Sequence, residues 1–156
     1  MTAACNSEWT TYVSALLVPT VAVFGLYIAW RQWTTARNRL KLDLFDRRYA
    51  VYEAVLKLLA VVFRTATVPE ADLRDFDMGT MGAQWLLSAD LCNYLRDELR
   101  KKAVKLQTIE ATLPSVPVED PKRRILVAEK HEALTWFHDQ LEVVNRKFAP
   151  FLQLKH

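Results

Sequence analysis

The chain has 156 residues, of which 51% are hydrophobic and 25% charged, and its formal net charge is +3. That length fits one domain, and the composition excludes a collagen-like, low-complexity or fully disordered chain. Two cysteines are too few for a disulfide scaffold, and three histidines argue against a histidine-rich metal site.

The first element is a run of 22 residues without a charged side chain, at positions 9–30, which follows a short tail at 1–8. As a helix the run would be about 33 Å long, enough to cross a hydrocarbon core of about 30 Å. A buried helix of a water-soluble domain would show a polar face instead. Aromatic rings mark both ends of the run, as in the two headgroup layers of a membrane: Trp9, Tyr12, Tyr27, Trp30 and Trp33. We therefore predict an uncleaved transmembrane helix.

Basic residues follow this run directly. Positions 31–48 contribute a net charge of +4, whereas positions 49–156 are neutral. The positive-inside rule then places the tail outside and residues 31–156 in the cytoplasm. A neutral domain makes nucleic acid an unexpected partner. The cluster should attract anionic lipids next to the bilayer and includes Arg31, Arg37, Arg39 and Lys41.

The remaining chain has helical periodicity. Apolar residues recur at spacings of three and four across 31–66, and a second stripe from Phe45 to Phe63 widens the apolar face. We expect an amphipathic juxtamembrane helix there and give self-association through the extra stripe the same weight as a wholly intramolecular core.

The segment 67–156 predicts a helical hairpin that packs on the juxtamembrane helix. Proline and glycine indicate a loop at 68–82, and a second helix should carry an apolar stripe from Trp85 to Leu113. Asp120 and Pro121 predict the start of a third helix, and Pro150 its end. Its apolar stripe should consist of Ile125, Leu126, Leu134, Phe137, Leu141, Val144 and Phe148. The predicted fold class is all-α, with one N-terminal transmembrane helix that continues into a cytoplasmic bundle of about three helices.

No arrangement of residues points to catalysis. His131 and His138 lack the H-E-x-x-H spacing of a zinc helix, and the acidic residues of 70–77 lack the pattern of a calcium loop. Cys92 has no base at useful spacing and is interpreted as a small core residue. We expect no enzyme activity, no catalytic residue, no metal and no cofactor.

One basic stripe lies on the outer face of the predicted second helix. Its residues could bind an anion such as a nucleotide or a phospholipid headgroup, or they could be the solvated face of a neutral domain. The candidate anion-binding residues are Arg96, Arg100, Lys101 and Lys105.

Four strings resemble a widespread group of uncharacterised bacterial single-pass inner-membrane proteins with a small helical cytoplasmic domain. They are positions 28–33 (Ile-Ala-Trp-Arg-Gln-Trp), 39–53, 94–106 and 148–152. The resemblance implies a bacterial inner-membrane location, and it transfers no functional residue.

Three functions remain open. The first is a membrane-anchored interaction or scaffold protein, self-associating or bound to another membrane protein. The second is an oligomeric membrane effector or sensor whose cytoplasmic domain binds an anionic ligand through the basic stripe. An enzyme is the third, and it has the least support because no nucleophile, base and orienting group can be named.

Overall fold

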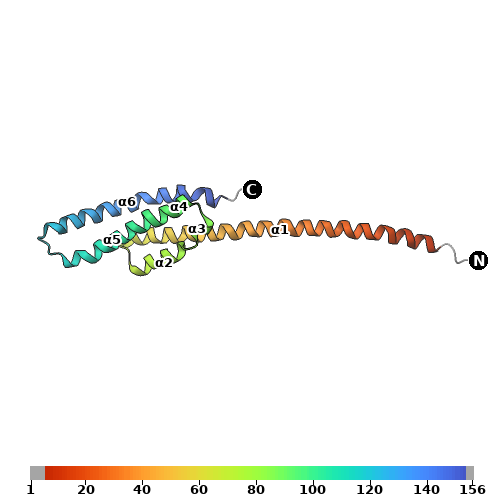
Figure 1. Cartoon of the computed structure of the whole chain (residues 1–156), viewed down its shortest axis with the longest axis horizontal. Coiled ribbons are helices and arrows are strands. Elements are labelled where there is room, and N and C mark those ends of the chain that lie inside the picture. Colours follow the sequence, from red (N-terminus) through yellow and green to blue (C-terminus); the bar gives the residue numbers. More distant parts are fainter. Residues whose placement is uncertain (1–5, 154–156) are drawn as a thin grey trace, which may run out of the picture. The chain divides into compact units, whose positions relative to one another are not determined.

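A computed structural model describes residues 6–153 of the chain, and it describes side chains from Thr20 onward. Over that range every element is a helix, which confirms the all-α prediction (Figure 1). The elements are α1 (Asn6–Thr65), α2 (Glu70–Thr80), α3 (Ala83–Leu86), α4 (Ala89–Asn93), the π-helix η1 (Tyr94–Arg100), α5 (Lys101–Thr112), the 3₁₀-helix η2 (Leu113–Ser115) and α6 (Pro121–Leu152). The chain divides into two compact units, Met1–Leu42 and Asp43–His156.

In the first unit, every side chain from position 20 to 33 is exposed. They include large apolar side chains such as Val23 and Leu26, which are 65% and 72% exposed. In the part of the chain whose side chains are described, no helix is both long and apolar enough to cross a membrane. The predicted span at 9–30 begins before that part, so Trp9 and Tyr12 lie outside it.

The juxtamembrane helix predicted for 31–66 belongs to α1, which runs without interruption to Thr65. Its end is marked by Ala66, whose φ of 51° lies in the left-handed region that terminates many helices. The amide of Ala66 still donates to the carbonyl of Val62 at 2.9 Å, so the last turn is closed.

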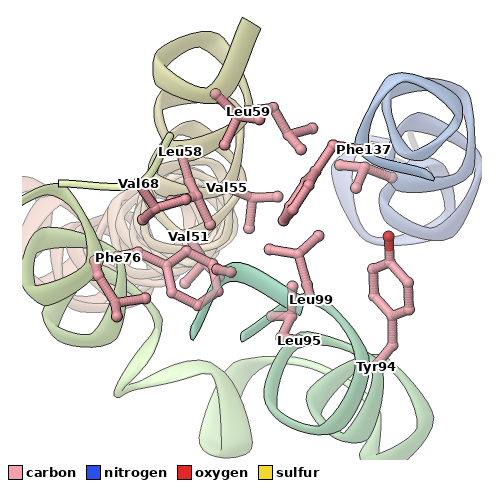
Figure 2. Packing of buried hydrophobic residues seen from close by; sticks show 14 of the residues in the cluster. Val51, Val55, Leu58, Leu59, Val68, Phe76, Tyr94, Leu95, Leu99 and Phe137 are labelled. Atoms are coloured by element: carbon pink, nitrogen blue, oxygen red, sulfur yellow. The ribbon is translucent and has the colours of Figure 1, made fainter. Parts of the chain in front are cut away.

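The core of the second unit lies where α1, α2, η1, α5 and α6 meet (Figure 2). Val55 and Leu58 face it from α1, as the helical periodicity predicts, and Leu99 faces it from η1. Phe137 of α6 is fully buried against them. Apolar side chains from these five helices thus close one core.

The predicted loop at 68–82 is wrong, because most of it is α2. Leu73 and Phe76 are three residues apart and both are buried, which gives this short helix an apolar face. Glu70 and Asp72 occupy its first turn, where carboxylates interact favourably with the helix dipole. Burial of two side chains outweighs the glycine content on which the loop prediction was based.

The predicted second helix is interrupted. Leu87 is extended (φ −125°, ψ 173°) and separates α3 from α4, whose first turn is capped by Ser88. Trp85 was expected in the apolar stripe but is 83% exposed.

The third helix begins as predicted, since the Asp120 carboxylate accepts a hydrogen bond from the amide of Lys122 at 2.8 Å. It ends at Leu152 and not at Pro150, so the predicted end is wrong by one half turn. Leu141 and Ile125 belonged to the predicted buried stripe, yet they are 42% and 59% exposed.

Candidate functional site

A hollow of about 300 Å³ opens between α2, α3 and the segment from α4 to η1. Cys92, Arg96 and Arg100, each four residues from the next, line one side of it. Residues four apart lie on the same face of a helix, so the three side chains point to one side. Arg96 and Arg100 belong to η1, and π-helical turns frequently occur at functional sites.

Carboxylates hold both guanidinium groups. Arg100 donates from Nε to Asp77 Oδ1 at 2.7 Å and from Nη2 to Oδ2 at 3.0 Å. Arg96 donates from Nη2 to Asn93 Oδ1 at 3.0 Å and to Asp97 Oδ2 at 3.1 Å. Hydrogen bonds from Arg96, and then from Lys101, lower the pKa of Asp97. The positive charge on the rim of the hollow is therefore partly neutralised.

The two predicted lysines lie apart from the hollow. Lys101 Nζ lies 3.1 Å from Asp97 Oδ1, and Lys105 Nζ lies 3.1 Å from Glu129 Oε2 on α6. The structure thus brings Arg96 and Arg100 to one hollow and gives each of the four predicted cations a carboxylate partner. Binding of an anion by these residues stays a prediction.

The thiol of Cys92 is half-buried on the wall of the hollow. Burial raises its pKa, and the nearby charge of Arg96 lowers it by less. A raised pKa keeps the group as a thiol, and the thiolate is the nucleophilic form.

Histidines and acidic residues form no cation site in the described part of the chain, where no three metal-ligating side chains come together. His138 packs its ring edge-on against Phe63, with centroids 6.0 Å apart. Asp75 of the acidic segment pairs with Lys57 at 2.9 Å.

The predicted membrane-anchor residues within the described range are exposed. Tyr27, Trp30 and Trp33 are between 54% and 61% exposed, and the guanidinium of Arg37 lies 5.7 Å from the ring centroid of Trp33. Exposure also holds for the other basic residues of this set, Arg31, Arg39 and Lys41.

The sequence predicted only the α1 half of one surface of the second unit, which we term the α1–α6 seam. The phenol of Tyr52 donates to Asn145 Oδ1 at 2.7 Å across it. The seam consists of a row on α1 (Tyr49, Tyr52, Leu56, Ala60 and Phe63) and a row on α6 (Leu134, His138, Leu141 and Asn145). The second apolar stripe on 45–63 was the available signal, whereas Leu134 and Leu141 of its partner row on α6 were assigned to the apolar stripe of the third helix.

No family model, curated protein or solved structure matches the chain. The resemblance to bacterial inner-membrane proteins therefore stays a prediction.

Proposed function

We propose that this protein is a membrane-anchored interaction protein that self-associates. Segment 9–30 anchors it in the bacterial inner membrane, the tail lies outside, and residues 31–156 lie on the cytoplasmic side. The observation that carries the proposal is the exposure of every side chain from position 20 to 33, apolar ones included. A helix that is apolar all round requires either a protein core or a lipid environment.

The charge and aromatic pattern supports the same orientation. Tyr27, Trp30 and Trp33 place amphipathic rings where the uncharged run ends, and Arg31 begins the basic cluster. Aromatic rings favour the headgroup layer, and basic residues favour the cytoplasmic face with its anionic lipids.

An interaction role is supported by the second unit, which leaves apolar side chains at its surface. Trp85, Met81 and Met78 are between 69% and 83% exposed. Exposed aromatic and methionine side chains are enriched where proteins contact one another.

Membrane fractionation with an alkaline wash tests the anchor. We expect the full chain to stay in the washed membrane pellet. The double variant Val23→Asp/Leu26→Lys should move to the supernatant, because each charge near a helix centre costs about 2.5–3.5 kcal/mol on insertion scales. The matched control Leu40→Lys/Leu42→Asp changes two exposed apolar residues outside the run and should stay in the pellet. Recovery of the unaltered chain in the supernatant would refute the anchor.

A second candidate function is binding of an anionic ligand that regulates a membrane effector, supported by Arg96 and Arg100 on the wall of one hollow. Asp77 competes for Arg100, so Asp77→Asn should strengthen binding. The test is thermal unfolding with a panel of nucleotides, since a ligand selective for the folded state raises the melting temperature. Absence of any shift for both the unaltered chain and Asp77→Asn would count against this candidate.

A further inference from the structure

The contacts between helices of the second unit fall into two kinds. Ion pairs join three pairs of elements: Lys57 to Asp75 between α1 and α2 (2.9 Å), Arg100 to Asp77 between η1 and α2 (2.7 Å), and Lys105 to Glu129 between α5 and α6 (3.1 Å). Among the described residues, no ion pair crosses between α1 and α6.

The α1–α6 seam, which lies wholly in the described range, instead contains no ion pair, and its large side chains are half-exposed. Tyr49 and Phe63 are each 46% exposed, and Leu141 is 42% exposed. Its row on α1 repeats at spacings of three and four, as does its row on α6, so each row keeps to one face of its helix. Neither row contains an Asp, Glu, Lys or Arg.

We propose that the α1–α6 seam is the surface through which two copies of this chain associate. The inference deepens the proposed function and rests on it, because it names the surface of self-association. In a two-fold dimer the same patch meets itself, so a patch that carried net charge would face like charge across the interface. Rows without Asp, Glu, Lys or Arg meet their own copy without that repulsion.

The composition of the seam favours a second copy over a membrane surface. Helices that lie on a bilayer carry Lys and Arg on the polar face beside their apolar residues. The rows are instead flanked by the exposed carboxylates of Glu53 and Glu142, which anionic lipids would repel. The rows also present aromatic rings, which are enriched among residues that dominate binding energy between proteins.

Anchoring of the chain in a membrane makes a small interface sufficient for two copies to associate. Copies held in one membrane are confined near each other, and such confinement raises the effective concentration of the second binding partner. A seam narrower than that of an obligate dimer can then hold two copies together.

A charge-insertion experiment tests the inference on the full chain in detergent. Leu141→Lys places a cation in the seam of both copies, whereas Ile125→Lys places one on another face of the same helix at a residue that is 59% exposed. Light scattering after gel filtration should show a dimer or larger assembly for the unaltered chain and for Ile125→Lys. For Leu141→Lys the dissociation constant of the dimer should rise about tenfold or more, as it does when a hot-spot residue of an interface is lost.

Cross-linking in membranes gives a readout that needs no disruptive change. In a chain with Cys5→Ser and Cys92→Ser, Ala60→Cys places a thiol in the α1 row, while Ala50→Cys places one beside the hollow between α1 and α2. We expect a disulfide-linked dimer from Ala60→Cys only.

The outcomes separate the two proposals. The seam is overturned, and the anchor left intact, by one pair of results in a protein that stays in the washed membranes. The Leu141→Lys variant would remain oligomeric, and Ala50→Cys would cross-link as well as Ala60→Cys. A monomer in detergent that also fails to cross-link through Ala60→Cys overturns self-association itself, and loss from the membrane pellet overturns the anchor.

Discussion

At the residue scale, one polar pair inside the core is fully satisfied. Figure 2 shows the Tyr94 hydroxyl pointing toward α6, where it donates to Gln140 Oε1 at 2.7 Å. Gln140 Nε2 in turn donates to the carbonyl of Trp136 at 3.2 Å. Burial raises the pKa of Tyr94, so the phenol remains a donor well above neutral pH.

Removal of this hydroxyl should destabilise the fold. Tyr94→Phe leaves the buried Gln140 oxygen without a donor, which costs about 1–3 kcal/mol of unfolding free energy. Urea denaturation should show a lower midpoint with an unchanged slope. Tyr94→Phe combined with Gln140→Leu should recover part of the loss, because both polar groups are then gone. A single variant as stable as the unaltered protein would contradict the pairing.

The Cys92 thiol allows a pH-dependent prediction. A raised pKa leaves less thiolate at pH 8 than a free thiol has, so alkylation by iodoacetamide should be slower than for glutathione. Arg96→Gln removes the charge that lowers this pKa and should slow the reaction further. The rates are measured in Cys5→Ser, and denaturation should abolish the difference. A rate above that of glutathione in the folded protein would be inconsistent with burial.

At the element scale, α2 approaches α1 closely at Gly79. A Cβ atom at this position would lie 2.5 Å from the Cβ of Ala54, a distance that real contacts do not reach. Gly79→Ala should therefore force the two helices apart and cost about 1–3 kcal/mol, the usual range for overpacking. Thermal unfolding followed by circular dichroism measures the loss.

Two companion variants make this prediction specific. Gly82→Ala adds the same methyl group where no atom lies within 4 Å, so it should leave stability unchanged or slightly raised. Ala54→Gly combined with Gly79→Ala restores the space between the helices. The double variant should therefore lose less unfolding free energy than the sum of the losses in the two single variants. Equal stability of Gly79→Ala and Gly82→Ala would show that the helices are not in contact there.

Helices with long apolar series could be predicted from the sequence, and short ones could not. The series through Val55 and Leu58 and the cap at Asp120 each carry a local signal that tertiary packing reinforces. The buried pair on α2, Leu73 and Phe76, is too short a series to outweigh two glycines, and contacts of α2 with α1, η1 and α5 stabilise it.

The candidate site was predictable by residue type and not by geometry. The basic stripe was visible, but its pairing with Asp77 depends on where α2 packs. Cys92, Arg96 and Arg100 recur at intervals of four, which predicts one shared helix face, but this spacing does not distinguish the π-helix η1 from an α-helix. Exposure of Trp85 follows from the break at Leu87, which no proline or glycine marks.

At the scale of the whole molecule, the two units differ in how far they bury their side chains. Every fully buried side chain of the described range belongs to Asp43–His156, while the side chains at 20–33 are all exposed. A unit whose core is complete should fold without the other, and a helix that is apolar all round should require lipid or a partner.

We therefore expect a shortened chain, residues 43–156, to fold on its own. Its new N-terminus places Asp43 and Asp46 in the first turn, where carboxylates favour a helix start, and Asp43 already pairs with Arg47 at 3.1 Å. Circular dichroism in detergent-free buffer should show one cooperative unfolding transition. Tyr94→Phe should lower its midpoint by the same amount as in the full chain, because the Tyr94–Gln140 pair lies wholly inside this unit. A gradual transition that Tyr94→Phe does not move would mean that the core of residues 43–156 requires the first unit to order it.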